Sequence, residues 1–180
     1  MIYAIIALVL IAALLVGLYN RLAKQRVIVD EASSDIETFL KQRYDMIPNL
    51  VEIVKGYAKH EKETFREITE MRAKAMSAGS LSEKMEIEGE LTKGLSKIMA
   101  VAENYPELKA NTNFLELQSS LKDLEDNIQK SRRFYNGAAR DFNTMIAVFP
   151  NNLLAGVFGF SKVAFFEATE QEKENVKVKF

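Results

Sequence analysis

The chain has 180 residues, of which 24 are Lys or Arg and 25 are Asp or Glu, so its formal net charge is −1. A charge balance this close to neutral gives no global electrostatic drive toward nucleic acid. The absence of cysteine excludes disulfides, thiolate metal sites, thiol nucleophiles and a lipidated cysteine. With eight Gly and three Pro, and helix formers dominant after residue 20, the composition favours helices joined by short loops.

The first 20 residues carry no charged side chain and consist mainly of Ile, Leu, Val and Ala. As a helix, such a segment extends about 30 Å, which matches the hydrocarbon thickness of a bilayer. A cleaved signal peptide, the alternative, usually has a basic residue before its apolar run, whereas the first basic residue here is Arg21. The sequence therefore predicts an uncleaved transmembrane anchor at residues 1–20.

The charges next to this anchor predict its orientation. Arg21, Lys24 and Arg26 follow the apolar run, and no basic residue precedes it. Because basic residues concentrate on the cytoplasmic side of a span, the N-terminus is predicted to lie outside and the body, residues 21–168, in the cytoplasm. Tyr19 occupies the position of an aromatic residue at the membrane–water boundary. We expect a single-pass protein of the cell membrane.

The next predicted element is a long helix that begins near Ile36. Apolar residues recur at helical spacing through residues 36–75, and their phase is kept across Pro48. Because proline cannot hydrogen-bond to the carbonyl of Tyr44 and its ring crowds that group, we expect a kink between these two residues. The Ala-Gly-Ser run at residues 78–80 is predicted to end this helix, and Ser80 or Ser82 to cap the next one.

The following helix is predicted to run to about residue 104, where Tyr105 and Pro106 stop it. Asn111 or Thr112 then caps a helix whose apolar residues alternate at spacings of three and four over about five heptads. We expect this heptad seam to form the internal core of a bundle. Its members are Phe114, Leu117, Leu121, Leu124, Ile128, Tyr135, Ala138, Phe142, Met145 and Phe149, with Ser131 as a polar break.

A phenylalanine-rich segment, residues 153–166, follows Pro150 and contains one charge, Lys162. The favoured interpretation packs it as a short fourth element over the open end of the bundle, and the alternative makes it an apolar surface that meets the bilayer or another subunit. Residues 169–180 are predicted to be a polar tail. The predicted fold is therefore all-α: a transmembrane helix, then an antiparallel bundle of three long helices and a short fourth.

The sequence predicts no catalytic, cofactor or metal site. His60 is the only histidine, and the residue four positions after it is Thr64, so the second ligand of an HExxH zinc motif is missing. The acidic residues at 123–126 lack the glycine and the twelfth-position glutamate of a calcium loop. Arg132 and Arg133 form too small a basic patch to indicate nucleic-acid binding.

Several blocks in order resemble the LemA family from Tyr19 to the end of the chain. They are RYDMIPNLV at residues 43–51, KGYAKHE at 55–61, AENYPELKAN at 102–111, RRFYN at 132–136, FP at 149–150, FGF at 158–160 and FFE at 165–167. The resemblance implies a single-pass bacterial or archaeal membrane protein with a bromodomain-like, mirror up-and-down bundle and no established enzymatic activity. Members are similar to components of magnetosome membranes, which suggests scaffolding.

The shared blocks also supply candidate interaction or structural residues. We expect the amides among them, including Asn104 and Asn136, to act as helix caps or buried hydrogen-bonding struts. The candidates are Pro48, Asn49, Tyr105, Pro106, Asn111, Phe158, Phe160, Phe165 and Phe166.

The function expected from the sequence is that of a membrane-tethered scaffold that associates with itself or with other membrane proteins and uses no cofactor. One alternative is a sensor of small ligands or peptides, with a groove around Pro48 and the turn at residues 105–111. The other is a membrane-surface enzyme, for which the sequence supplies no converging acids or metal ligands.

The first prediction concerns the anchor and its orientation. A reporter fused after Phe180 is expected to be active only when it is of a kind that works in the cytoplasm, because the basic residues follow the span. A signal from a reporter that works only outside the cytoplasm would contradict this orientation. Release of the protein from membranes by a carbonate wash would contradict the anchor itself.

Overall fold

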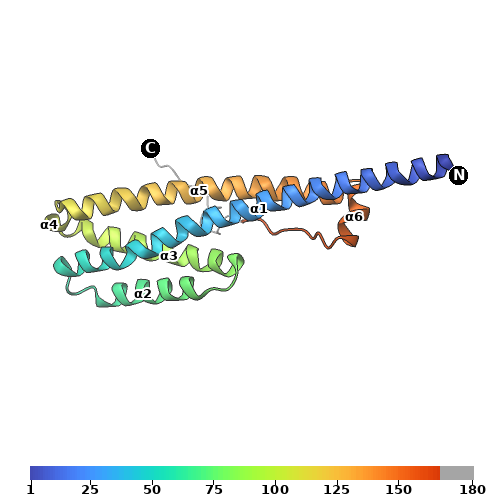
Figure 1. Ribbon diagram of the computed structural model, residues 1–180. Helices are drawn as coiled ribbons and strands as arrows, with labels where there is room; N and C mark the ends of the chain where they lie inside the picture. Colours follow the sequence, from blue (N-terminus) through green and yellow to red (C-terminus); the bar gives the residue numbers. More distant parts are fainter. Residues whose placement is uncertain (167–180) are drawn as a thin grey trace, which may run out of the picture. The chain divides into compact units, whose positions relative to one another are not determined.

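The computed structural model describes residues 1–166, apart from the side chains of Leu81 and Ser82, and this part of the chain is helical with no strand. The all-α prediction is confirmed. The helices are α1 (Ile2–Tyr57), α2 (Lys62–Ser77), α3 (Leu81–Glu103), α4 (Pro106–Lys109), α5 (Thr112–Ala147) and α6 (Asn151–Val157) (Figure 1). The predicted tail at residues 169–180, and the end of the predicted bundle at residue 168, lie outside the described residues.

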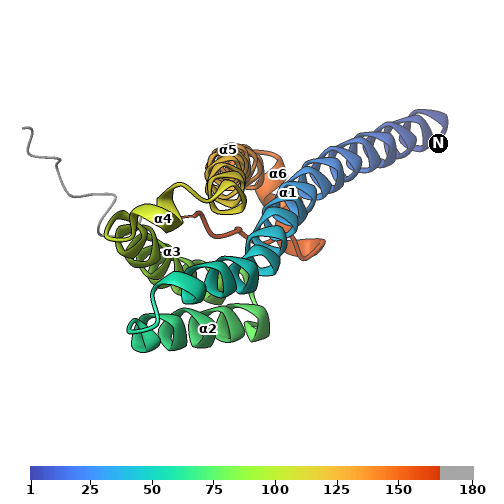
Figure 2. The ribbon, with the colours of Figure 1, turned by 90° about the vertical axis from the view of Figure 1, so that its left-hand side faces the viewer.

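The helices form two compact units, and α1 and α5 each contribute residues to both. The first unit consists of Met1–Asp35 and Ser131–Phe165 and includes α6. The second consists of Ile36–Lys130 together with Phe166, and it includes α2, α3 and α4. Within the second unit α2 and α3 run side by side, as both ribbon views show (Figures 1 and 2).

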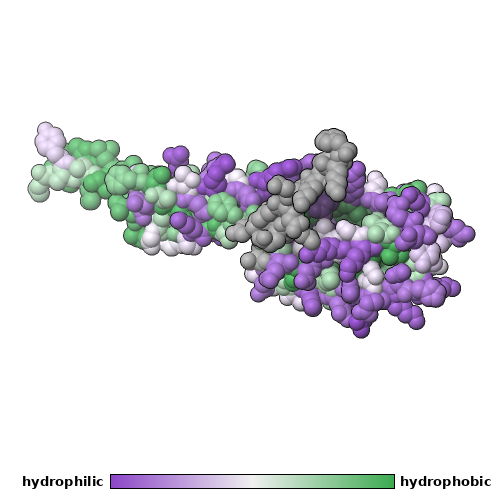
Figure 3. Space-filling model, turned by 180° about the vertical axis from the view of Figure 1, so that it is seen from behind, coloured by the Kyte–Doolittle hydropathy of each residue, from purple (hydrophilic) through white to green (hydrophobic). Residues whose placement is uncertain are grey.

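In the first unit the surroundings of α1 change at Leu22. Every residue from 1 to 17 is exposed, although nearly all of them are apolar, whereas Leu22 is fully buried. Figure 3 shows hydrophobic side chains over the visible face of this N-terminal segment. Within the described part of the chain, α1 is the one helix whose length and composition suit a membrane crossing. An apolar helix with no polar side and no protein around it requires lipid as its solvent.

The long helix predicted for residues 36–78 is instead two helices. α1 continues through Pro48 to Tyr57, and α2 begins at Lys62 after a short turn in which the Glu61 amide donates to the Ala58 carbonyl at 3.3 Å. The apolar phase does not reveal this break, because the turn itself contributes a fully buried residue, Ala58, and α2 buries the same stripe. A four-residue turn without Gly or Pro also carries no sequence signal of its own.

A side chain from α2 compensates for the proline inside α1. Pro48 has no N–H, so the carbonyl of Tyr44, four residues earlier, lacks its usual helical donor. The Arg72 Nε donates to that carbonyl at 2.6 Å. Because the orphaned carbonyl is satisfied, the helix continues past the proline, and α2 is joined to α1 at the same point.

The predicted caps of α3 and α5 are confirmed. Ser80 accepts the Glu83 amide at 3.2 Å, and the Glu83 carboxylate accepts the Ser80 amide, which completes a capping box. Asn111 accepts the Phe114 amide at 3.0 Å, so it caps α5. The other side of the Asn111 amide donates to the Tyr57 hydroxyl at 3.1 Å, which ties the start of α5 to the end of α1.

The heptad seam of α5 is confirmed as core along most of its length. Ile128 and Phe142 are fully buried, and Leu121 and Leu124 are 8% exposed. Phe149 is 78% exposed because α5 ends at Ala147, so this ring lies past the last helical turn.

The second prediction tests the bond between Arg72 and Tyr44 with a double-mutant cycle on the full chain in detergent. Arg72→Met alone leaves the Tyr44 carbonyl without a donor and is expected to cost about 1–3 kcal/mol of unfolding free energy. In a Pro48→Ala background the new amide at residue 48 donates to that carbonyl, so the same change is expected to cost much less. Urea unfolding of the four variants measures the difference.

The matched control is Arg66→Met, because Arg66 also lies on α2 and its ion pairs with Glu63 and Glu70 are exposed. It is expected to change stability little in either background. An equal loss from Arg72→Met with and without Pro48 would show that the arginine does not substitute for the missing helical donor.

Candidate functional site

A buried ionic cluster joins three helices in the second unit. Arg43 on α1 is 3% exposed and Glu88 on α3 is 1% exposed. The Arg43 guanidinium lies 3.0 Å from a Glu88 carboxylate oxygen and 3.1 Å from a Glu125 oxygen on α5, and it donates to the Thr92 hydroxyl at 2.9 Å. The Tyr44 hydroxyl donates to the second Glu88 oxygen at 2.5 Å. These bonds fix α1, α3 and α5 to one another.

The buried ionic cluster has the features of a structural interaction that holds helices together. Both oxygens of Glu88 accept hydrogen bonds from groups of the same protein, and its side chain has no exposed surface. A general base must reach a substrate proton within hydrogen-bonding distance. A carboxylate enclosed in this way has no route to a substrate, so Glu88 serves the packing of the helices.

Neither Arg43 nor Glu88 is among the candidate residues predicted from the sequence, although the sequence carries a signal for the pair. Glu88 falls on the apolar stripe of α3 between Met85 and Leu91, and Arg43 falls on the stripe of α1 between Leu40 and Ile47. Charged residues are rarely fully buried unless they are paired. Two opposite charges that each replace an apolar residue at helical spacing therefore indicate a buried pair.

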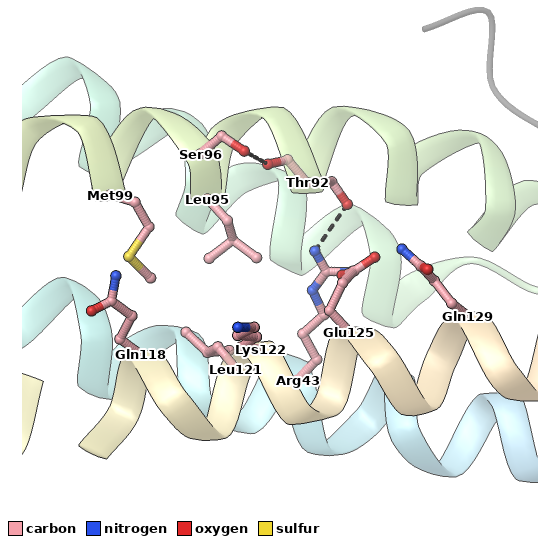
Figure 4. Close-up of a pocket in the computed structure, with 10 residues that line it drawn as sticks. All are labelled: Arg43, Thr92, Leu95, Ser96, Met99, Gln118, Leu121, Lys122, Glu125 and Gln129. Atoms are coloured by element: carbon pink, nitrogen blue, oxygen red, sulfur yellow. Dashed lines mark hydrogen bonds and ion pairs between the residues drawn. The ribbon is translucent and has the colours of Figure 1, made fainter. Parts of the chain in front are cut away.

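A groove of about 560 Å³ lies between α3 and α5 beside this cluster. Figure 4 shows side chains from the two helices facing one another across it, with Arg43 and Glu125 at its wall and Met99 opposite Gln118 near one end. Its volume is within the range of ligand sites, and its lining mixes apolar and polar groups. The lining residues are Arg43, Thr92, Leu95, Ser96, Met99, Gln118, Leu121, Lys122, Glu125 and Gln129.

Of the groove expected around Pro48 and the turn at residues 105–111, only the part at Pro48 is present, as a second, smaller cleft between α1 and α2 that no residue of that turn lines. Its volume is about 380 Å³, and Pro48, Val51 and Lys55 of α1 face Thr69 and Arg72 of α2 across it. Asn49 does not line it. This amide is exposed in the interior of α1, so the expectation that it acts as a cap or a buried strut is wrong.

The other predicted residues of the shared blocks at 102–111 lie at helix ends. Asn104 is the C-cap of α3, Tyr105 the N-cap of α4 and Pro106 the first residue of α4, where a missing N–H costs nothing. Asn111 caps α5 as described. These positions account for the block as a tight connection between two helices, in which Leu108 is fully buried.

The four candidate phenylalanines occupy different surroundings. In the first unit, Phe158 and Phe160 lie 5.0 and 5.9 Å from the Tyr19 ring, and Phe160 also lies 6.2 Å from Phe142. Phe160 is partly buried, whereas Phe158 is 46% exposed. Phe166, in the second unit, is buried. Phe165 is 46% exposed, so the expectation that it packs inward is wrong: it lies in a segment after α6 that is neither helix nor strand, in which both Ala164 and Phe165 are exposed.

Polar side chains of α5 hold this non-helical segment in place. Asn143 donates to the Val163 carbonyl and accepts the Val163 amide, both at 2.9 Å, and the Tyr135 hydroxyl donates to the Ala164 carbonyl at 3.0 Å. Burial raises the pKa of the Tyr135 hydroxyl, Arg26 opposes this shift and Asp30 adds to it. The phenol therefore stays protonated and able to donate. Asn143 gave no sequence signal, since its partner is a backbone group 20 residues away.

Comparison with known proteins identifies the chain's relatives. The sequence model of the LemA family matches residues 32–180. The chain belongs to the LemA family. Protein LemA of Metamycoplasma hominis is 29% identical over 162 residues, which cover 89% of this chain and 74% of that protein.

Magnetosome proteins are also similar to this LemA-family chain. Magnetosome protein MamQ 1 of Paramagnetospirillum magneticum is 25% identical over 193 residues, which cover 93% of the chain and 71% of that protein. Magnetosome protein MamQ of Magnetospirillum gryphiswaldense is 24% identical over 189 residues, which cover 91% of the chain and 70% of that protein. Together with the apolar start of α1, these relatives make the chain a membrane-associated helical protein.

The third prediction concerns the buried ionic cluster. Arg43→Met leaves Glu88 charged and without its main partner in the interior, so we expect a loss of about 3–5 kcal/mol of unfolding free energy. The double variant Arg43→Met, Glu88→Met replaces both charges with apolar groups and is expected to recover most of that loss. Urea unfolding of the full chain in detergent measures both.

The control is Lys97→Met, which breaks an exposed ion pair with Glu67 between α3 and α2 and is expected to change stability little. A double variant as unstable as Arg43→Met alone would show that the cluster contributes through its hydrogen bonds and not through charge compensation.

Proposed function

We propose that this protein is a non-catalytic scaffold, anchored by residues 1–20, that associates with further copies of itself at the membrane surface and keeps its body in the cytoplasm. The observation that carries the proposal is the continuity of α1. The segment suited to lipid and the segment that packs with α5 belong to one helix with no loop at their junction. The anchor therefore holds the first unit rigidly at the bilayer, which suits a protein that presents surfaces to partners.

The buried charged groups of the second unit serve its own packing. Inside the second unit, Arg43 and Glu88 bind one another and neighbouring side chains of the same chain. Among the described residues, His, Asp and Glu side chains form no group of three placed to hold a metal ion. In this function the interior of the second unit stabilises the fold, and the surface of the protein binds partners.

Exposed apolar side chains outside the anchor support self-association. In the first unit Val27 of α1 is 61% exposed and Phe134 of α5 is 58% exposed. Both side chains lie on helices whose other faces are packed, so a partner that covers them removes apolar area from water. A second copy of the chain supplies the same residues and therefore a matching surface.

The fourth prediction tests self-association in membranes. The chain has no cysteine, so each single-cysteine variant gives an unambiguous cross-link. Membranes that contain the full chain with Phe134→Cys or Val27→Cys are expected to yield disulfide-linked dimers on mild oxidation. Ser119→Cys on α5, which is also exposed, is the matched control and is expected to remain monomeric.

A fluorescent protein fused after Phe180 gives an independent measurement. Spots in native membranes are expected to bleach in more than one step. Single-step bleaching together with monomers from both cysteine variants would contradict self-association. A fluorescent protein that is degraded or dark because it lies outside the cytoplasm would contradict the orientation and leave the cross-linking result unaffected.

A second candidate function is a sensor that binds a small ligand or peptide in the groove between α3 and α5. The volume of that groove, about 560 Å³, favours it. Ser96→Trp fills the groove from an exposed position, so it is expected to abolish any rise in melting temperature that a peptide or metabolite mixture causes. Equal shifts for the wild type and the variant would exclude this groove as the binding site.

A further inference from the structure

The first unit exposes a group of apolar side chains beyond the end of α5. No charged residue occurs between Asp141 and Lys162. Within that stretch Phe149 is 78% exposed and Val157 77% exposed, fractions that are unusual for residues outside a membrane span. We call this group the apolar collar; it consists of Val148, Phe149, Leu153, Val157 and Phe158.

Local hydrogen bonds fix the outward direction of the collar. On the inner side of α6, Asn151 is 7% exposed and donates to the Met145 carbonyl at 3.0 Å, and Ala155 is 5% exposed. Leu153 and Val157 are four residues apart, so they lie on one face of α6. At the end of α6, Gly159 has a φ of +74°, which turns the chain back so that the Phe160 amide donates to the Ala155 carbonyl at 2.8 Å. The collar is thus held outward by a folded structure.

Contacts with α1 give the collar a depth relative to the membrane. Tyr19 is the last but one residue of the uncharged N-terminal run, and its ring lies 5.0 Å from that of Phe158, a member of the collar. Amphipathic aromatic rings favour the boundary between lipid and water. A side chain in contact with Tyr19 therefore lies at the level of that boundary.

The same unit shows which way α5 runs from this level. Phe142 lies next to Arg26, with 5.9 Å between the guanidinium carbon and the ring centre, while Tyr19 is adjacent to Phe158 and Phe160. The electrostatic influence of Arg26 and Asp30 reaches Tyr135, further back along α5. Moving from Phe142 toward Tyr135 thus leads away from the lipid span, and moving toward α6 leads to the membrane surface.

Positive charge lies where lipid phosphates are expected. A cleft of about 590 Å³ is lined by Leu18 and Arg21 of α1 and by Arg140, Asp141, Val148 and Phe149, among others. Arg140 forms an exposed ion pair with Asp141 at 3.1 Å, so two arginines against one aspartate leave this lining net positive. The apolar lining belongs to the collar and to the end of the span, and the two arginines adjoin it. This order, from apolar side chains to basic ones, matches the order of acyl chains and phosphates across the interfacial layer.

We propose that the apolar collar is seated in the interfacial layer of the bilayer that α1 crosses, so that α6 is a second point of membrane attachment. The collar is continuous with the lipid-facing end of α1, and this continuity selects lipid as its occupant. The attachment goes beyond the proposed scaffold function, because it requires no second copy of the chain. It restrains the tilt of the first unit about the span.

The absence of tryptophan from the chain makes the experiment direct. The full chain with Leu153→Trp or Val157→Trp is reconstituted in vesicles of phosphatidylcholine and phosphatidylglycerol that carry a nitroxide. The nitroxide is placed either next to the headgroup or at the end of the acyl chain. We expect blue-shifted emission from both variants, quenched several-fold more strongly by the nitroxide next to the headgroup.

Phe134→Trp is the matched control, because it also replaces an exposed apolar residue of the first unit. On a helix that rises about 1.5 Å per residue, it lies about 20 Å from Ala147, on the side away from α6. It is expected to be unquenched by either nitroxide, because this part of α5 lies away from the lipid. Its emission wavelength is not compared, since a second copy of the chain covers this residue under the proposed self-association. Quenching of this residue equal to that at 153 and 157 would overturn the depth that we assign.

The remaining outcomes also decide the proposal. Long-wavelength, unquenched emission from residues 153 and 157 would show that the collar faces water and would overturn it. Blue-shifted emission without quenching would overturn it in favour of cover by a second copy. Stronger quenching from the end of the acyl chain would place the collar inside the hydrocarbon and overturn an interfacial seat. None of these results bears on the cross-linking test of self-association, so the two proposals fail separately.

Discussion

The apolar side chains of α1 are suited to lipid before Leu22, and from Leu22 onward most of them are covered by protein. This change of surroundings determines how the rest of the first unit is arranged. Before this residue, apolar groups are uncovered and require lipid; after it, Leu22, Val29 and Ala32 are buried by protein. Because α1 continues without a break from lipid into the protein body, its apolar side chains need protein cover from the point at which lipid no longer covers them. Other segments of the chain must therefore pack against α1 from that point onward. The end of α5, α6 and the Phe158–Phe160 turn gather at that point, against Tyr19.

In the second unit, helix association depends on polar groups that are costly to leave unpaired. The carbonyl of Tyr44 that Pro48 leaves without a donor accepts a hydrogen bond from Arg72, and the carboxylate of Glu88 accepts from Arg43 and from Tyr44. Apolar packing tolerates small shifts between helices, whereas a buried charge or an orphaned carbonyl does not. These bonds thus specify the register of α1 against α2 and α3, in addition to any stability that they contribute.

Sequence reasoning succeeded where the signal is local or periodic. The apolar N-terminal segment, the Ser80 and Asn111 caps and most of the α5 seam depend on residues within a few positions of one another. It failed where tertiary contacts decide. The turn before α2 keeps the apolar phase through Ala58, and Phe165 is exposed on a non-helical segment that Asn143, 20 residues before Val163, holds in place. Three candidate residues chosen by resemblance, Tyr105, Pro106 and Asn111, proved to be helix-end positions, since a tight connection restricts sequence as strongly as a binding site does.

The uninterrupted junction of α1 also has a mechanical consequence. A flexible loop between a membrane span and the domain that follows it would let the span rotate independently of that domain. A continuous helix instead transmits rotation of the span to the domain. Each residue turns a helix by about 100° and advances it by about 1.5 Å. One residue inserted next to Arg21 would therefore rotate Tyr19 by about 100° relative to the buried face of α1 that begins at Leu22. Twisting or vertical movement of the span, such as a change in bilayer thickness produces, would reach Leu22 and its packing partners undiminished. The first unit is therefore mechanically coupled to the membrane.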